Sequence, residues 1–500
     1  MINSRMLDID LVTAFDSAYA RGRAPVIEPA YNVVSAGLGQ RSGYATSTSN
    51  PEFRAISTVE HDSLAPASTA TSAQNSPRQT EGELHGHYLG PASGLTFLRR
   101  VRKRLDQSVS FSQPSSIFAF GDPDLLQSDV DPSFCMMLSR SDAQRLVDRY
   151  FDFAMPTYRF LHRPTIQDWF IEFYETLGSM RDANRAPPKL ALLFMVIAHG
   201  YVYMPDDEKP GPEDLASRYY QAAEHQLGRE KGIIRVTSIQ ARLSQCYYLL
   251  TQSRINHCWS LFGSVVHLIL AIGLNRNRGF GSSNTLSLVD VECCRRTFWC
   301  AYTLDVYLSL VLGRPRMFHD EDIDMELPGR IEDEALTPGA IASPSLVGHN
   351  TMLAPIAHMK LARIIASILR GLYSIKPISS DRRSMLIERV SKELSDWRVG
   401  VSNFLDIDRN RLTPRPPIVQ RQRNVLNLTY WHAIILTYRP FVLESFMHSI
   451  QGEGDEAQDD LMSDDESVQQ CLAAAVNTTK TIDEMTRHKQ MFRAFWVCLP

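Results

Sequence analysis

Apolar side chains recur every three to four residues along most of the chain after residue 140, which is the spacing of one face of an α-helix. No run of four to eight residues alternates apolar and polar side chains, the pattern of a half-buried strand. The predicted helices cover residues 141–155, 163–177, 190–204, 287–312, 351–373, 380–404, 423–448 and 467–487, and three more begin near Glu213, Ser238 and His257. The pattern therefore predicts an all-α fold, a large multi-helix domain.

The helix predicted at residues 287–312 has the clearest ends. Ser287 and Asp290 form a capping-box pattern at its start. Gly313 can adopt the left-handed conformation that stops a helix, and Pro315 prevents its continuation. An apolar stripe and several bulky aromatic residues lie between these ends. We therefore expect this helix to be central and largely buried.

Asp305 lies inside that apolar stripe. A buried carboxylate must be paired or protonated, and no arginine lies three or four residues away on the same helix. Its partner should therefore come from elsewhere in the fold. We predict Arg439, which stands at the Tyr-Arg-Pro end of another apolar helix and can pair with a carboxylate through two hydrogen bonds. In the alternative, Asp305 turns out to a rim and caps a neighbouring helix.

Composition divides the chain into four parts. They are a Ser/Thr-rich tail (1–84), a leading part with a basic cluster (85–140), a helical core (141–330) and a C-terminal helical part (331–500). The tail is predicted to be disordered, because fourteen of the forty residues from 41 to 80 are Ser or Thr and little apolar surface is available for burial. Residues 452–466 are predicted to form a disordered acidic loop, since they carry eight acids and no base.

The basic cluster consists of Arg99, Arg100, Arg102, Lys103 and Arg104. Such a run is typical of a nuclear-import signal or of a patch that contacts phosphate groups. A solvated helix face is an equal alternative. The net charge of the chain is −4, so the protein as a whole does not attract DNA, and any contact with DNA should be weak or indirect.

Composition places the protein among soluble intracellular proteins. Hydrophobic residues make up 44% and charged residues 22% of the chain. None of the eight cysteines forms a C-x-x-C pair, which favours reduced, buried thiols over disulfides or a zinc site. The N-terminus has acids where a signal peptide needs an apolar stretch, and the longest apolar run is too short to span a bilayer. We therefore expect no membrane partner.

Asp320, Asp322 and Asp324 are the strongest candidate for metal chemistry. The residues that follow lack the glycine and glutamate of a calcium-binding loop. A magnesium-diphosphate site in a helical isoprenoid-type enzyme is the alternative function, but no second acidic helix motif faces these residues. The histidines and cysteines lack zinc-ligand spacing, and no serine or cysteine has a recognisable nucleophile context. We predict that the chain is not an enzyme and assign no catalytic, metal-binding or DNA-contacting residue.

Residues 292–328 closely resemble the signature of the fungal-specific transcription factor domain, E-x-x-R-R-x-F-W-x-x-Y-x-L-D-x-x-x-S-x-x-x-G-R-P followed by an acidic D-x-D. The chain supplies Glu292, Arg295, Arg296, Phe298, Trp299, Tyr302, Leu304, Asp305, Ser309, Gly313, Arg314, Pro315, Asp322 and Asp324. Four further stretches resemble the family in the same order, at residues 88–98, 150–166, 238–276 and 426–442. The ordered set covers most of residues 85–500.

The resemblance implies an all-helical regulatory domain that acts in the nucleus through effector sensing, self-inhibition or contacts with partners. Expected partners are other transcription regulators, a second copy of the chain, or a small-molecule effector whose pocket the resemblance does not assign. A scaffold without a ligand is the alternative.

In the family, a six-cysteine zinc cluster that reads DNA precedes this domain. The first cysteine here is Cys135, already inside the resembling region, so neither zinc nor direct DNA reading is expected of these 500 residues. The chain also stops in the apolar segment MFRAFWVCLP, which leads us to expect that it is truncated relative to the family or acts through a partner.

Overall fold

The structure is a computed structural model of the whole chain. The residues that it describes are 83–84, 87–105, 137–230, 233–277, 286–342, 350–376, 378–405, 416–451, 458–488 and 490–491. Of residues 83, 84, 87, 102–105, 444–451 and 458–465, only the backbone is described. Nearly all of the predicted disordered tail lies outside the described residues, and so do Cys135 and Cys498.

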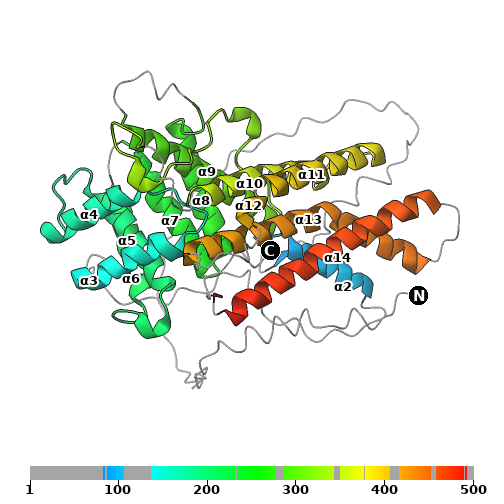
Figure 1. Cartoon of the computed structure of the whole chain (residues 1–500), viewed down its shortest axis with the longest axis horizontal. Helices are drawn as coiled ribbons and strands as arrows, with labels where there is room; N and C mark the ends of the chain where they lie inside the picture. Colours follow the sequence, from blue (N-terminus) through cyan, green and yellow to red (C-terminus); the bar gives the residue numbers. More distant parts are fainter. Residues whose placement is uncertain are drawn as a thin grey trace, which may run out of the picture. The chain divides into compact units, whose positions relative to one another are not determined.

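The described residues are almost entirely helical, which confirms the all-α prediction (Figure 1). The helices are α2 (Gly94–Leu105), α3 (Arg140–Arg149), α4 (Arg163–Glu175), α5 (Ala186–Val202), α6 (Leu215–Gly228), α7 (Val236–Thr251), α8 (Ile255–Ala271), α9 (Leu288–Leu312), α10 (Leu353–Leu372), α11 (Ser380–Gly400), α12 (Ser402–Leu405), α13 (Pro417–Gln451) and α14 (Gln458–Arg487). A single π-helical turn, Tyr150–Ala154, follows α3, and short 3-10 turns lie at Asp206–Glu208, Asp320–Asp322 and Asp333–Ala335. The only strands among the described residues are β1 (Glu83–Leu84) and β2 (His87–Tyr88), which pair antiparallel.

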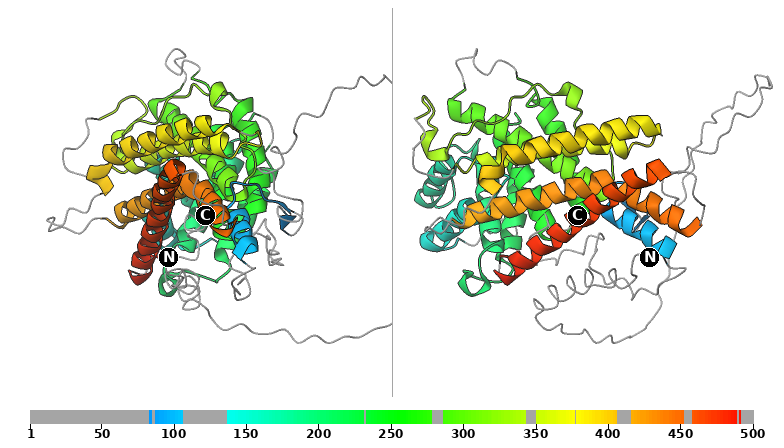
Figure 2. Two further views of the ribbon diagram at one scale, coloured as in Figure 1. Left: turned by 90° about the vertical axis from the view of Figure 1, so that its right-hand side faces the viewer. Right: turned by 45° about the vertical axis from the view of Figure 1, so that its right-hand side comes forward.

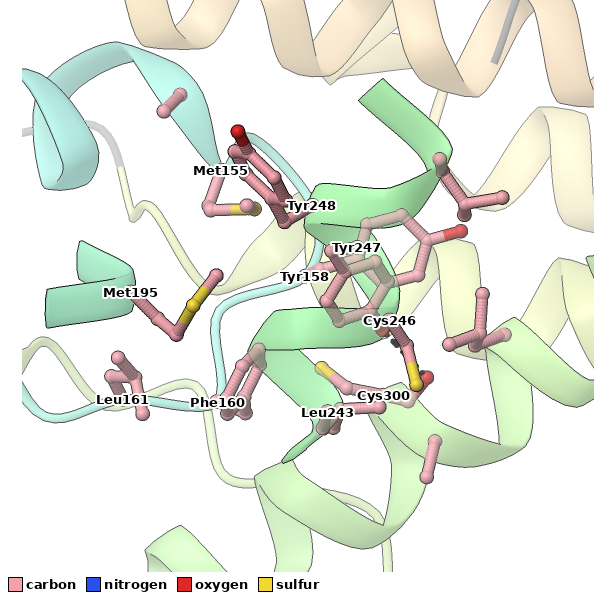
Figure 3. Close-up of a cluster of buried hydrophobic side chains, with 14 of the residues drawn as sticks. Met155, Tyr158, Phe160, Leu161, Met195, Leu243, Cys246, Tyr247, Tyr248 and Cys300 are labelled. Carbon is pink, nitrogen blue, oxygen red and sulfur yellow. Dashed lines mark hydrogen bonds between the residues drawn. The ribbon is translucent and has the colours of Figure 1, made fainter. Parts of the chain in front are cut away.

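The core gathers around α5, α7 and α9. Helix α5 is buried along almost its whole length, because its residues are apolar on every side. It crosses α3 closely at Gly200, where an added Cβ would lie 2.2 Å from the carbonyl oxygen of Leu146, so only glycine fits. Figure 3 shows the aromatic and sulfur-containing side chains that fill the space beside α7. There the ring centroids of Tyr158 and Tyr247 lie 4.6 Å apart, and the Tyr247 hydroxyl donates to the carbonyl oxygen of Cys300 on α9 (3.0 Å).

Helix α9 has the ends that its sequence predicts. The Ser287 side chain accepts from the Asp290 amide, and the Asp290 carboxylate accepts from the Ser287 amide, which completes the capping box. Gly313 ends the helix with φ of 66°, in the left-handed region that glycine adopts without strain. Phe298 and Ala301 are fully buried. The prediction of a central, largely buried helix is confirmed.

The C-terminal helices pack on one another and on α9. Helices α13 and α14 run side by side, as both views of Figure 2 show. Helix α10 contacts α9, α11 and α13. Trp397 of α11 donates from its indole N–H to the carbonyl oxygen of Ala357 on α10 (2.9 Å) and stacks on Tyr430 of α13.

Most helix boundaries shift by a few residues from the prediction, and three differences have an identifiable cause. Ser139 caps α3 by accepting from the Asp142 amide, because the helix begins one residue before Ser141. Helix α14 begins at Gln458, so the predicted acidic loop at 452–466 was wrong for residues 458–466. Acids in the first turns of a helix interact favourably with its positive N-terminal end, which is why this acidic stretch can be helical.

The third difference concerns Arg439, which was expected at a helix end. Helix α13 instead continues through Pro440, in agreement with the predicted range 423–448. A proline inside a helix leaves the carbonyl four residues earlier without its N–H partner. That carbonyl belongs to Leu436, and the hydroxyl of Tyr373 donates to it (2.7 Å). A side chain from outside the helix therefore replaces the missing hydrogen bond.

Candidate functional site

The polar residues of α9 hold the chain segment that follows the helix, residues 314–335, here named the return segment. Asp305 is fully buried and accepts from the backbone amides of Met317 (2.9 Å) and Phe318 (3.1 Å). The guanidinium of Arg316 lies 3.3 Å from the same carboxylate. Burial raises the pKa of Asp305, and these amides together with Arg316 oppose the shift. Asp305 therefore fixes the first turn of the return segment against α9.

The predicted partner of Asp305, Arg439, was wrong. Arg439 donates instead to the Tyr373 hydroxyl and to the carbonyl oxygens of Pro91 and Ala92. Asp305 is 1% exposed, so the alternative position at a rim was wrong as well. The actual partner is eleven residues further along the chain, because the turn at Gly313 brings Arg316 back beside the helix.

Asp320 forms the next contact between the return segment and α9. Its carboxylate accepts from the Tyr302 hydroxyl (2.7 Å) and lies 3.3 Å from both Arg316 and Arg370. Burial alone would raise the pKa of Asp320, but the Tyr302 hydrogen bond and the arginine charges outweigh it and lower the pKa. Because Arg370 belongs to α10, Asp320 joins α9, the return segment and the next helix.

The middle of the return segment is fastened to both α9 and the end of α8. Trp299 donates from its indole N–H to the carbonyl oxygen of Glu326 (2.8 Å), and Arg295 pairs with the Glu326 carboxylate. Asn275, just after α8, donates to the Asp322 carbonyl oxygen (2.7 Å). The Asp324 carboxylate accepts from the amide of residue 277 (2.6 Å) and lies 3.3 Å from Arg276. The acidic D-x-D of the signature therefore contacts residues 275–277, which follow α8.

Arg296 is the most deeply buried charge of the site, with no exposed surface. It pairs with Glu292 one turn earlier on α9 (3.0 Å) and with Asp333 of the return segment (2.5 Å). Burial alone would lower the pKa of Arg296, but these carboxylates raise it. Asp333 also accepts from the Arg163 amide at the start of α4 (3.0 Å), and His162 contacts its carbonyl oxygen (2.9 Å). This charged cluster ties α9 to the N-terminal helices.

The end of α9, with the glycine and arginine of the signature, holds residues 88–94, which lead into α2 and are here named the leading segment. The Gly90 amide donates to the Leu312 carbonyl oxygen (2.9 Å). A Cβ added at Gly90 would lie 1.8 Å from the Gly313 oxygen, so the two backbones touch and neither position accepts a side chain. Arg314 donates to the Tyr88 carbonyl oxygen (3.1 Å) and lies over the Trp259 ring of α8. Pro315 is exposed in the turn.

Together these contacts form a clasp, in which signature residues of α9 hold the return segment, the leading segment, α4, α8 and α10 in one arrangement. Several partners could not be found from helical spacing because they lie outside α9. Arg316, Glu326 and Asp333 lie beyond the turn at Gly313, and Asn275 lies before the helix. The buried carboxylates of α9, Glu292 and Asp305, were the sequence feature that indicated such partners, since each requires a cation or an amide N–H nearby.

The acids of the return segment do not converge on one point. Asp320 faces Arg316, whereas Asp324 faces Arg276, and each is an ion pair. Among the described residues, no group of three or more histidine, cysteine, aspartate or glutamate side chains could hold a metal ion. The magnesium-diphosphate hypothesis therefore has no support in this part of the chain.

The basic cluster lies on α2. Arg99 and Arg100 are partly exposed, while the side chains of Arg102, Lys103 and Arg104 lie outside the described residues. Their role in nuclear import stays a prediction.

The fungal specific transcription factor domain matches residues 147–399, just over half of the chain. The chain belongs to this family. The matched region begins in α3 and ends in α11, so it contains the clasp between α9 and the return segment.

Named relatives are transcription regulators. The chain is 24% identical over 390 residues to "Activator of stress genes protein 1" of Candida albicans, covering 72% of the chain and 38% of that protein. It is 23% identical over 416 residues to "Transcriptional activator protein acu-15" of Neurospora crassa, covering 81% and 43%. It is 23% identical over 452 residues to "Positive regulator of purine utilization" of Emericella nidulans, covering 72% and 42%. The chain spans about two-fifths of the length of these relatives.

No solved structure matches the chain. Within the described residues, none of the helices combines the length and the apolar character needed to cross a bilayer.

Proposed function

We propose that this chain regulates transcription in the nucleus, as a helical domain that acts on partner proteins rather than by reading DNA. The observation that supports this most is the clasp. Its signature residues attach α9 to several other elements of the fold and do not line an open catalytic site. A domain whose parts are joined through one buried cluster can pass a change at one surface to another. The relatives named as activators and regulators support the same role.

A tethered reporter assay tests this function. Fused to an unrelated DNA-binding module, the chain is expected to change the transcription of a reporter gene that carries the matching site. Arg296→Ala should abolish the effect, because breaking a buried ion pair costs roughly 3–5 kcal/mol. Arg295→Ala is the matched control, since its pair with Glu326 is partly exposed and such pairs contribute about 1 kcal/mol or less. A reporter that does not respond to the wild-type fusion would contradict the proposal.

Nuclear import is the role we propose for the basic cluster on α2. Replacing its five basic residues should move a fluorescent fusion of the full chain from the nucleus to the cytoplasm. Replacing Arg382 and Arg383 of α11 is the control, since this pair is also basic but lies in a different helix. An unchanged nuclear signal after the first replacement would refute the import role.

A further inference from the structure

Arg439 of α13 is a buried cation whose described partners are all neutral. The residue is 3% exposed. Its guanidinium donates to the Tyr373 hydroxyl (2.7 Å), to the Pro91 carbonyl oxygen (3.3 Å) and to the Ala92 carbonyl oxygen. Among the described residues, no carboxylate lies within ion-pair distance of it. An arginine is always charged in a protein, and a buried charge without a counter-ion is costly.

Two arginines of the clasp show what is missing at Arg439. Arg296 pairs with two carboxylates, and Arg316 lies 3.3 Å from both Asp305 and Asp320. Arg439 is nearly as buried as Arg296, yet its partners supply only partial negative charge. A full negative charge beside it would therefore stabilise this region more than the neutral oxygens do.

The N-terminus of α2 lies directly beside Arg439, which donates to the Ala92 carbonyl oxygen. Figure 2 shows α2 lying near the second half of α13. The first bond that α2 closes runs from the Phe97 amide to the Ser93 carbonyl oxygen. The amides at the start of a helix have no acceptor inside the helix, and this end carries a partial positive charge. Helix α2 has no acidic residue in its first turn to compensate.

Two hydroxyl groups at the same helix end have no hydrogen-bond partner in the described structure. They are Oγ of Ser93 and Oγ1 of Thr96, whose residues are 0% and 1% exposed. Residues 93, 96 and 97 lie on one face of α2, because positions three and four apart are neighbours on a helix. Phe97 of that face lies under the Arg439 guanidinium, so the face is turned toward α13.

We propose that Ser93, Thr96 and Arg439 form a binding site for a small anion that carries a carboxylate or phosphate group. Hydrogen-bond donors and positive charge meet there, and a donor-rich helix N-terminus is the usual place for such an anion. These residues are buried in this structure, so the anion has to enter before α2 and the leading segment pack against α13. Binding therefore favours the state in which α2 is packed against α13.

The anion site is connected to the clasp through the leading segment. Pro91 and Ala92 accept from Arg439, and Gly90 one residue earlier donates to Leu312 at the end of α9. An anion that holds α2 in place consequently also holds the contact between the leading segment and α9. This gives the proposed regulatory domain a route by which a small effector changes the clasp.

Thermal unfolding of the purified full chain tests the site. Inorganic phosphate and the small carboxylates malonate and citrate are titrated separately at constant ionic strength, with sodium chloride as the reference. At least one anion class is expected to raise the unfolding temperature in a saturable way, because a ligand that binds only the folded state stabilises it. The class that does so identifies the ligand chemistry as phosphate or carboxylate.

The variants Arg439→Gln and Ser93→Ala/Thr96→Val test which residues bind the anion. The first should abolish the saturable shift. The second should weaken apparent affinity at least about tenfold, since hydrogen bonds to a charged group are among the stronger ones. Without added anion, the hydroxyl variant should be as stable as the wild type or more stable, so it remains informative if Arg439→Gln fails to fold. Arg423→Gln is the matched control, because Arg423 is a buried arginine of the same helix that donates to the Leu405 carbonyl oxygen.

Three results would overturn the proposal. One is a saturable shift that both site variants retain, and another is a shift that never saturates and is equal in all variants. The third is a wild type that no tested anion stabilises. A hydroxyl variant that is then also less stable without anion would show that a group of this chain already fills the site. The inference rests on the proposed function only for its regulatory meaning. A saturable shift with a silent reporter would refute the function alone, and a responsive reporter without a shift would refute the site alone.

Discussion

Removing the Asp305 carboxylate tests whether this group holds the return segment against α9. In Asp305→Ala, the buried amide of Phe318 and the half-buried amide of Met317 lose their acceptor, and Arg316 loses one of its two carboxylates. A buried donor left without a partner costs about 1–3 kcal/mol, and the weakened ion pair adds to this. We expect a loss of roughly 3–5 kcal/mol in the free energy of unfolding. Asp305→Asn keeps one acceptor oxygen and should lose about half as much.

A double-mutant cycle identifies the partner. Urea unfolding is followed by circular dichroism for Asp305→Ala, Arg316→Met and the double variant. The two changes should be coupled by about 1–2 kcal/mol, because the groups lie 3.3 Å apart. The same cycle with Arg439→Met should be additive within about 0.5 kcal/mol. Additive losses in the Arg316 cycle, or strong coupling in the Arg439 cycle, would show that Arg316 is not the partner of Asp305.

Further predictions concern packing, pH and the close backbone contact. Phe298→Ala should lower the free energy of unfolding by roughly 3–5 kcal/mol through the cavity that it leaves, whereas a loss under 1 kcal/mol in a urea titration would contradict its buried position. Burial raises the pKa of Asp333, but the charge of Arg296 outweighs burial and lowers the pKa. The contribution of Asp333 to stability is therefore complete above about pH 4 and is lost as the pH falls through the folded-state pKa. The urea midpoint should therefore drop as the pH falls below about 4, and less steeply in Asp333→Asn. Gly90→Ala should expose the leading segment to limited proteolysis, because its Cβ would overlap the backbone of Gly313; an unchanged cleavage pattern would argue against the contact.

Local features of the sequence were sufficient to predict most of the long helices and the ends of α9. The capping box at Ser287 and the glycine stop at Gly313 depend on residues within a few positions of one another, so they can be read without the fold. The ends of α9 were predicted correctly because their causes are local.

The partners within the clasp could not be predicted in this way. Asp305 had to be paired, but which arginine meets it depends on the direction of the chain after Gly313, and helical spacing says nothing about that. The acidic start of α14 was misjudged for a related reason, since charge density alone does not exclude a helix whose N-terminal end favours acids. Donor groups such as Ser93 had no signal in the sequence, because their lack of a partner appears only once the helices are assembled.

The proline inside α13 makes two helices depend on each other. Since Pro440 cannot donate to the Leu436 carbonyl, that oxygen stays available to the Tyr373 hydroxyl, which in turn accepts from Arg439. An alanine at position 440 would supply the missing N–H and compete with the tyrosine for the same oxygen. The substitution would repair the helix while loosening the attachment of α10 and the hold on Arg439. We therefore expect Pro440 and Tyr373 to be replaced together in related sequences, because each is useful only while the other is present.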